Sequence, residues 1–401
     1  MDSVDLQRFE ARGLDKKYWA HESDAVLSWL VSRDFEGYDP FDALSSALFR
    51  YSPFALSAAA RIAWTQFHKL SPVNLRPLLF VPRTRNPKAL GLALTGLARQ
   101  MAARGSIDRH LGDRLVKWIA SSRSVNSAGW GYPFSWQNRA FFAPRGTPNA
   151  VCTAFVVGGL LDYAAVTGDS EASRLAVESI PYWTEELRRS HVNDTVCFSY
   201  TPLDNSQIHN VNLLVAATIA RLGREAAKDT LVKLAKRAMQ FSLAAQRPDG
   251  SWPYGEGRRQ SWIDGFHTGF NLGALQRLKA LLGDAEAGSA RARGYAYFRR
   301  QLLDKAGRPK YYARATLYPI DIHSAAQAIV TVLEASDLEL ESLRLAVDIA
   351  NWTQTTLGLG QGTYAYRRGR LVLNAIVYAR WAQAWMFRAL AELELALAKS
   401  A

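Results

Sequence analysis

An internal repeat limits the possible folds of this chain more than any other property of its sequence. A glycine- and aromatic-rich stretch, a short polar loop and an apolar, small-residue helix follow one another several times. The residues that open these helices are Asn86, Asn149, His209, His267, His323 and Arg380, at successive spacings of 63, 60, 58, 56 and 57 residues. A period near 58 residues is too long for a tetratricopeptide or ankyrin repeat and fits two helices with their loops.

Each repeat is expected to contain two kinds of helix. Segments between the marked helices, such as 171–189 and 226–246, carry apolar residues at three- and four-residue intervals, as in a helix with one wet face. The marked helices are apolar nearly all round, which indicates burial on both sides. We therefore predict an all-α fold, an (α/α)6 toroid of alternating inner and outer helices, with short aromatic β-ribbons in its loops. The prediction is one domain over residues 1–401, with residues 1–50, the weakest match to the repeat, as a helical N-terminal cap.

Composition and charge narrow the class of partner. The 401 residues carry a net charge of +13, and a basic surface attracts nucleic acid, anionic lipid or an acidic substrate. Lys and Arg are scattered among acids without a nucleic-acid-binding signature, so we expect no nucleic acid partner. Two cysteines are too few for a disulfide framework. The N-terminus lacks a signal-peptide core, and no stretch reaches the roughly 18 uninterrupted apolar residues of a membrane span, so we predict a cytoplasmic protein without a transmembrane segment.

The toroid predicts where the polar residues of the repeat converge. Parallel inner helices bring their N-terminal ends to one mouth, and a polar group there needs a partner or a cavity. Aromatic residues of the preceding loops would rim the same mouth. The predicted substrate-binding residues are Trp130, Tyr132, Trp136, Asn149, Tyr200, Asn212, Trp252, Tyr254, Asn271, Tyr312, Gln327 and Trp381. Aromatic platforms interleaved with hydrogen-bonding groups suit a sugar.

Six residues are candidates for the chemistry itself. They are Asp264, His267, Asp321, His323, His209 and Arg380. Two carboxylates in one cavity can act as general acid and base, although Asp just before a helix is also typical of an N-cap. Three histidines at one repeat position favour a shared site over isolated core histidines. The arginine suits a carboxylate or phosphate, its alternative being an ion pair with Asp321 or Asp264. The same His and Asp residues could also bind a divalent metal, but no compact metal-binding motif is present, and we predict neither a metal nor a cofactor.

Several segments resemble known families. QRPDGSWPYG (246–255) resembles the QW repeat of terpenoid-cyclase and prenyltransferase toroids. The succession GWGYPFSWQ, FSYTPLDNS, WIDGFHTGFNL, YPIDIHSAAQA and RWAQAWMFRAL, within residues 125–395, resembles an uncharacterised family of bacterial and archaeal α/α-toroid proteins. Members of that family are associated with surface-polysaccharide biosynthesis. WIDGFHTG is similar to the segment that carries the catalytic Asp of unsaturated-uronyl hydrolases, which implies that role for Asp264, and to a segment of glucuronyl C5-epimerases.

These observations predict a carbohydrate-active enzyme whose substrate is a glycan, uronate-containing or otherwise anionic. One chemistry is hydrolysis by Asp264 and Asp321 around a water molecule. The other is proton abstraction by His267, His323 or a Tyr, as in a lyase or C5-epimerase. A second hypothesis is a terpenoid or polyprenyl-diphosphate enzyme, although the chain has no DxDD motif. A third is a non-catalytic glycan-binding component of a polysaccharide assembly system. The oligomeric state stays open.

Overall fold

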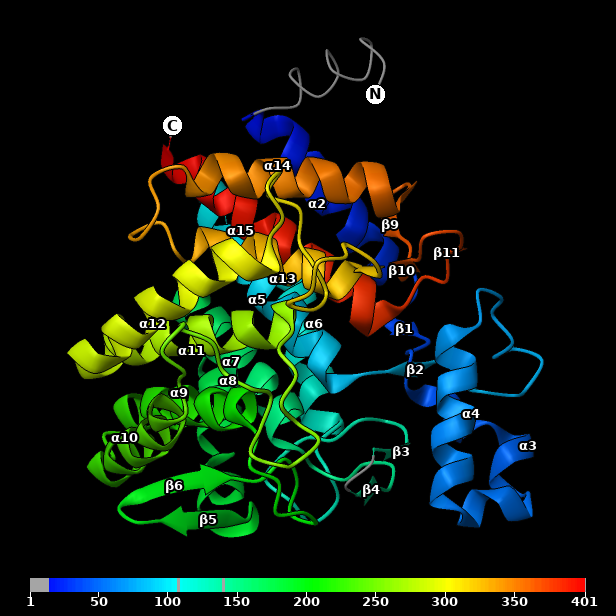
Figure 1. The fold of residues 1–401 in the computed structure, drawn as a ribbon, viewed down its shortest axis with the longest axis horizontal. Coiled ribbons are helices and arrows are strands. Elements are labelled where there is room, and N and C mark those ends of the chain that lie inside the picture. Colours follow the sequence, from blue (N-terminus) through cyan, green and yellow to red (C-terminus); the bar gives the residue numbers. More distant parts are fainter. Residues whose placement is uncertain (1–13, 107–108, 139–140, 401) are drawn as a thin grey trace.

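The computed structural model describes residues 14–106, 109–138 and 141–400, and within them twelve α-helices form two layers around one axis (Figure 1). The inner helices are α5 (Pro87–Arg104), α7 (Ala150–Thr167), α9 (His209–Glu225), α11 (Gly265–Leu282), α13 (Ile322–Leu333) and α15 (Trp385–Ser400). The outer helices are α2 (Lys16–Val31), α6 (His110–Ser121), α8 (Ser170–Val177), α10 (Asp229–Ala244), α12 (Ala285–Tyr297) and α14 (Ser342–Leu357). Single π-turns precede α15 and follow α8 and α12, at η5 (Ala379–Ala384), η3 (Tyr182–Glu186) and η4 (Phe298–Leu302).

The inner helices close into a ring. Each packs on the next along the chain, and α15 packs on α5. The outer helices lie one against each inner helix: α6 on α5, α8 on α7, α10 on α9, α12 on α11, α14 on α13 and α2 on α15. The predicted (α/α)6 toroid is confirmed. Helix α2, which lies within residues 1–50, is the outer helix that packs on α15. The ring closes at this point, because α15 in turn packs on α5.

Asparagine and aspartate start four of the inner helices. Their side chains accept hydrogen bonds from first-turn backbone N–H groups, which would otherwise be unpaired. These N-caps are Asn86 on α5, Asn149 on α7, Asp264 on α11 and Asp321 on α13. At the opposite end, α5, α7 and α11 stop at a glycine in the left-handed conformation, which favours residues without a Cβ. The repeat therefore aligns the N-termini of these helices at one mouth.

Glycine also sets the distance between α5 and α7. A Cβ added at Gly159 would lie 2.2 Å from the carbonyl oxygen of Gly91, and one at Gly91 would lie 2.4 Å from the carbonyl oxygen of Phe155. The two backbones approach so closely here that any side chain would force them apart. Two of the small residues in these apolar helices thus have a packing role in the ring.

The strands are short and lie in the loops, as predicted. Four antiparallel pairs are β1 (Glu36–Gly37) with β2 (Thr84–Arg85), β3 (Trp136–Gln137) with β4 (Phe142–Ala143), β5 (Arg189–Val192) with β6 (Thr195–Phe198), and β8 (Gly358–Gly360) with β9 (Thr363–Tyr364). A three-stranded sheet has the order β11 (Leu373–Asn374), β10 (Arg367–Arg368), β7 (Ile320–Asp321).

Residues 42–80 form a small helical unit beside the ring, which we call the insertion. It contains η1 (Asp42–Ser45), α3 (Ala47–Arg50), η2 (Pro53–Leu56) and α4 (Ala58–Leu70), and it lies at the right of Figure 1. Its core is held by Arg76, which donates to Asp42 Oδ1 at 2.6 Å and to the Asp39 carbonyl at 2.9 Å. Helix α4 packs on β3, and Asn374 of β11 donates to the Ser71 carbonyl at 2.8 Å. The insertion therefore adjoins the loops of the mouth.

Within the described part of the chain, α7 alone has the length and apolar composition of a membrane-spanning helix. It lies in the inner ring between α5 and α9, and this position accounts for its apolar composition.

Candidate active site

Asp264 and His267 form a carboxylate–imidazole pair at the start of α11. One carboxylate oxygen, Oδ1, accepts the backbone N–H of His267 at 2.9 Å, and the other, Oδ2, lies 2.7 Å from His267 Nδ1. The Asp264 side chain is 3% exposed, whereas that of His267 is 23% exposed. A buried carboxylate beside Nδ1 makes that nitrogen the donor, so Nε2 becomes the proton acceptor.

Aromatic rings and amides surround this pair. The rings of Tyr254 and Trp262 stack at 4.5 Å, and Tyr254 lies 4.7 Å from the His267 ring. A small cavity, about the size of one water molecule, is lined by Trp252, Tyr254, Asp264, His267 and Asn271 among others. The buried Oδ1 of Asn271 has no partner among the described residues. The structure therefore brings four other predicted site residues together around the His267 imidazole.

Asp321 is occupied by structural contacts. Its Oδ1 accepts the backbone N–H of His323 at 3.0 Å and the indole N–H of Trp381 at 3.2 Å. Its Oδ2 accepts two hydrogen bonds from Arg367, at 3.0 and 3.2 Å, and the side chain is fully buried. Both aspartates are thus N-caps, the alternative that the sequence left open, but only Asp264 also contacts an accessible imidazole.

The His323 ring is sealed among aromatic side chains at the centre of the ring of helices. Its centroid lies 4.4 Å from Trp385, 4.5 Å from Trp381 and 4.6 Å from Phe266. Neither ring nitrogen has a partner among the described residues. Burial, with the nearby Lys88 and Arg380 charges, holds the pKa of His323 well below its ordinary value, so the ring is neutral.

Lys88 on α5 is a buried base that the sequence analysis missed. Its ammonium lies 4.3 Å from the ring centroid of Phe155, 5.3 Å from Trp385 and 5.4 Å from Phe270. Burial, and then the Arg380 charge, hold the pKa of Lys88 well below its ordinary value. We call Lys88 and these three rings the central box. The available signal was a single Lys in the first turn of α5, followed by the largely apolar residues 89–98.

His209 and Asn212 lie in a different place from the one predicted. His209 Nδ1 is 3.4 Å from Ser242 Oγ on α10, and its Nε2 is 2.9 Å from Glu256 Oε1. Asn212 donates to the Ala238 carbonyl at 2.6 Å and to Ser242 at 3.0 Å, also on α10. The prediction that His209 shares a cavity with His267 and His323 is wrong, because both side chains of α9 turn toward the outer layer. Burial lowers the pKa of His209.

Arg380 is already paired, and its partner is neither of the aspartates considered from the sequence. Its Nε and Nη2 lie 2.5 and 2.8 Å from the two carboxylate oxygens of Asp39. The guanidinium also sits 5.0 Å from the Tyr132 ring centroid. Asp39 thus occupies one edge of the Arg380 guanidinium and supplies its countercharge, while the role of Arg380 toward a substrate carboxylate stays a prediction.

Several predicted binding residues have structural contacts of their own. Trp130 is fully buried and donates to the Ile119 carbonyl of α6, so it does not rim the mouth. Trp252 makes the equivalent bond to the Ser242 carbonyl of α10 while it also lines the small cavity. Gln327 donates to Thr331 at 3.1 Å, and Asn149 caps α7 with its Oδ1. The backbone of Tyr312 pairs with that of Asp264, which places Tyr312 beside the catalytic candidate.

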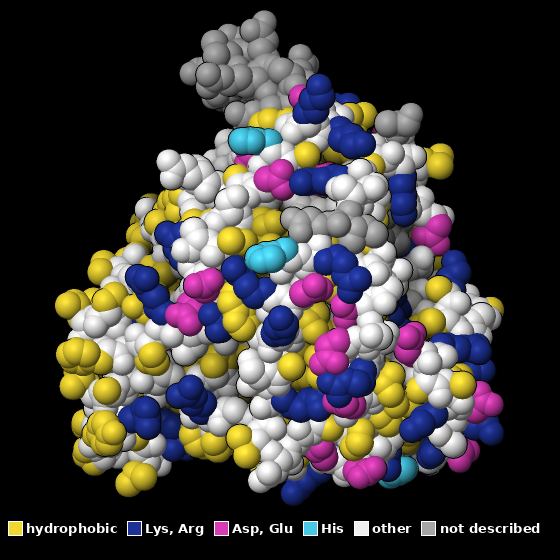
Figure 2. Space-filling model, turned by 180° about the vertical axis from the view of Figure 1, so that it is seen from behind, with side chains coloured by type: hydrophobic (Ala, Val, Ile, Leu, Met, Phe, Trp, Pro, Cys, Tyr) yellow, Lys and Arg dark blue, Asp and Glu magenta, His cyan; other side chains and the backbone are white. Residues whose placement is uncertain are grey.

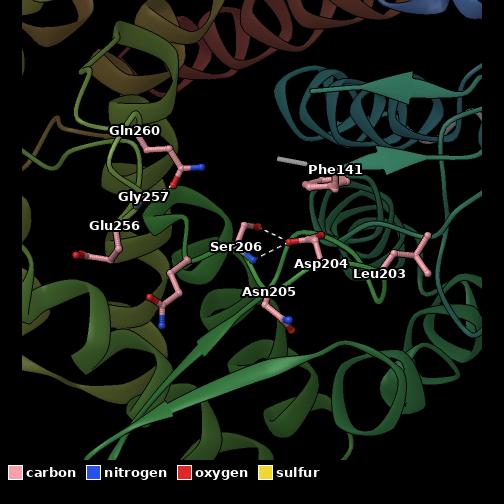
Figure 3. A pocket seen from close by; sticks show the side chains of 9 residues that line it. Phe141, Leu203, Asp204, Asn205, Ser206, Glu256, Gly257 and Gln260 are labelled. Atoms are coloured by element: carbon pink, nitrogen blue, oxygen red, sulfur yellow. Dashed lines mark hydrogen bonds between the residues drawn. The ribbon is translucent and has the colours of Figure 1, made fainter. Parts of the chain in front are cut away.

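A larger pocket lies between the segment before α9 and the segment before α11. It has a volume of about 430 Å³ and is lined by Phe141, by residues 203–207 and by the 256–260 loop (Figure 3). Phe141 joins an aromatic group in which Trp136 lies 5.1 Å from Phe141 and 5.3 Å from Tyr200. Burial raises the pKa of Tyr200 to about 12, so it keeps its proton. Trp136 and Tyr200 were predicted at the mouth, but the pocket beside them was not.

No known protein-family model matches the chain, and no curated protein does. Several solved structures do match the chain. A cellobiose 2-epimerase from Bacillus thermoamylovorans superposes with a TM-score of 0.61 at 11% identity, covering 80% of this chain and 90% of its own. A GH76 α-mannanase from Bacteroides thetaiotaomicron gives 0.55 at 12% identity, covering 79% and 87%. An unsaturated glucuronyl hydrolase specific for heparin gives 0.56 at 14% identity, covering 79% and 88%. The chain therefore shares the α/α-toroid fold of these proteins.

Proposed function

We propose that this protein is a carbohydrate-active enzyme that moves a proton on a glycan with the Asp264–His267 pair. The observation that carries the proposal is the 2.7 Å contact between a buried carboxylate and a partly exposed imidazole at the toroid mouth. A carboxylate that orients Nδ1–H makes Nε2 a general base and stabilises the imidazolium formed when it takes a proton. The similar structures are an epimerase, an α-mannanase and a glucuronyl hydrolase, which supports a sugar as the substrate.

The geometry favours proton abstraction over hydrolysis by two aspartates. Hydrolysis of that kind needs a second free carboxyl group, and Asp321 is held by Arg367 and Trp381. In proton abstraction, Nε2 of His267 takes a proton from a carbon next to a carbonyl or carboxylate. The electron pair moves onto that oxygen, and a proton then returns to the carbon in an epimerase. In a lyase the pair instead expels a leaving group from the neighbouring carbon.

Cations at the mouth support an anionic glycan as the substrate. Arg314 lies 4.9 Å from the Tyr312 ring centroid, and Lys310 donates to the Arg314 carbonyl. Lys69 of the insertion lies 4.5 Å from the Phe41 ring centroid and beside Arg367; burial, followed by that charge, lowers its pKa to about 8. Such a rim attracts the carboxylate of a uronate. The sequence resemblance within residues 125–395 supports a surface polysaccharide as its source.

The test is an incubation of the whole protein in deuterated water with uronate-containing polysaccharides and neutral disaccharides. Deuterium in the sugar without cleavage identifies an epimerase, a new double bond a lyase, and new reducing ends alone a hydrolase. His267→Gln should abolish the reaction, because glutamine keeps the hydrogen-bonding capacity without the base. His191→Gln, on the exposed hairpin of β5, is the matched control and should keep it. Turnover of a polyprenyl diphosphate with every glycan inert, or full activity of His267→Gln, would overturn the proposal.

A further inference from the structure

The insertion exposes an unusual density of apolar side chains. Among the described residues, twenty large apolar side chains are exposed, and nine of them lie between residues 48 and 80. Tyr51 is 85% exposed, Leu56 86% and Leu78 73%. Figure 2 shows apolar side chains gathered along the left edge of the molecule, the side formed by α3 and α4. An accumulation of this kind on one side of a folded protein marks an interaction surface.

A hairpin of the ring extends this surface. The turn between β10 and β11 carries Leu371, which is 98% exposed, and Val372. Residue Asn374 at its base bonds to Ser71 at the end of α4, so the turn adjoins the insertion. We call the exposed apolar side chains of residues 48–80, with Leu371 and Val372, the apolar patch.

The charges around the apolar patch have one sign. Residues 43–85 and 367–374 contain nine Lys or Arg and no Asp or Glu. Arg50, Arg83, Arg368 and Arg370 form no ion pair with any residue that the structure describes. Residues 114–161 also lack Asp and Glu, so what distinguishes these two segments is that their unpaired arginines lie among exposed apolar side chains.

We propose that the apolar patch docks the protein on an anionic membrane surface. Aromatic and aliphatic side chains that project from short helices and loops, with arginines between them, match the interfacial layer of a bilayer, where apolar groups enter the acyl boundary and cations meet anionic headgroups. A second copy of the chain fits less well, because a two-fold contact would bring the unpaired arginines of both copies into one interface. This inference does not depend on the proposed reaction.

The first experiment is flotation of the whole protein with vesicles, without any substrate. Vesicles of phosphatidylcholine and phosphatidylglycerol should carry the protein, and vesicles of phosphatidylcholine alone should carry much less. Tyr51→Ser, Leu56→Ser and Leu371→Ser together should weaken binding at least about tenfold. The control, Val125→Ser with Leu340→Ser, changes apolar residues that are equally exposed outside the patch and should bind like the wild type. Replacing Arg50, Arg83 and Arg370 by Gln should weaken binding and reduce its dependence on salt.

A second experiment locates the contact. Cys152 and Cys197 are buried, and burial raises the pKa of each thiol to about 12, so an introduced surface cysteine takes an environment-sensitive dye selectively. Dyes at Leu56→Cys and Leu371→Cys should brighten on addition of the anionic vesicles, and a dye at Leu340→Cys should not. The proposal is overturned if the protein binds to none of the vesicles. It is also overturned if the patch dyes brighten with protein concentration alone, because that outcome identifies a second copy as the occupant.

Discussion

Arg380 and Asp39 stand 341 residues apart in the chain and form a two-bond ion pair inside the toroid mouth. Both side chains are buried, at 4% and 5% exposure. Asp39 follows α2 and Arg380 lies in η5 just before α15, so the pair fastens the two ends of the chain together where the ring closes.

Asp39→Asn should destabilise the protein strongly. The substitution leaves a buried guanidinium without its countercharge, and breaking a buried pair in this way costs about 3–5 kcal/mol. Urea unfolding at neutral pH measures the loss. Glu171→Gln is the control, because Glu171 pairs with Arg174 on the exposed surface of α8 and its loss should change little. Equal effects of the two substitutions would contradict the closing role of the buried pair.

Two adjacent glycines in α7 should respond to alanine in opposite directions. Gly159→Ala places a Cβ 2.2 Å from the Gly91 carbonyl and forces α5 and α7 apart, and we expect a loss of more than about 2 kcal/mol. At Gly158 an added Cβ meets nothing within 4 Å, so Gly158→Ala should gain about 0.5–1 kcal/mol of helix propensity. The unfolding free energies of both variants test this, and a stabilised Gly159→Ala would rule out the close approach.

Asp264→Asn separates the capping role of Asp264 from its role in the pair. Asparagine is as good an N-cap as aspartate, so stability should change little. Because Asn cannot stabilise the imidazolium of His267, kcat on the substrate found by the glycan panel should fall about 10²–10⁴-fold with little change in KM. Asp284→Asn caps the outer helix α12 in the same way and should leave kcat intact. Equal rates for the two variants would remove Asp264 from the mechanism.

His68 should make the protein sensitive to acid. Burial, and then the Arg76 charge, lower the pKa of His68 from 6.5 to about 4. The unfolded chain binds a proton at this residue below pH 6.5, and the folded chain does not until about pH 4. Stability is therefore complete above pH 6.5 and is lost as the pH falls through this window, by up to about 3 kcal/mol.

Comparing His68→Phe with the wild type isolates this contribution. Phenylalanine keeps an aromatic ring against Trp64 and carries no titrating group. The fall in unfolding free energy between pH 7 and pH 4.5 should be smaller in the variant. His191→Phe, on the exposed surface, should keep the full wild-type fall. If His68→Phe loses stability as steeply as the wild type, the buried neutral imidazole is not responsible.

The ring could be predicted from the sequence because its signals are local and repeated, whereas side-chain directions could not. His209 is the first residue of α9, His323 the second of α13 and His267 the third of α11. Each step along a helix turns the side chain by about 100°. Residues that match within two positions in the repeat thus point in different directions, and His209 faces α10.

The partner of Arg380 shows a second limit of prediction from the sequence. Asp264 and Asp321 were the acidic residues nearest to it in the repeat pattern, but the actual partner, Asp39, precedes the insertion and belongs to no repeat. Only the closure of the ring brings the two together. The surroundings of Lys88 could not be predicted for the same reason. The three rings around it come from α7, α11 and α15, which only the closed ring brings together.

The central box has a consequence for how the interior of the ring is assembled. Lys88 belongs to the first inner helix to be synthesised, and one wall of its enclosure, Trp385, belongs to the last one described. Because Trp385 comes from α15, the helix that packs on α5 and closes the ring also completes the aromatic cover of the Lys88 amine.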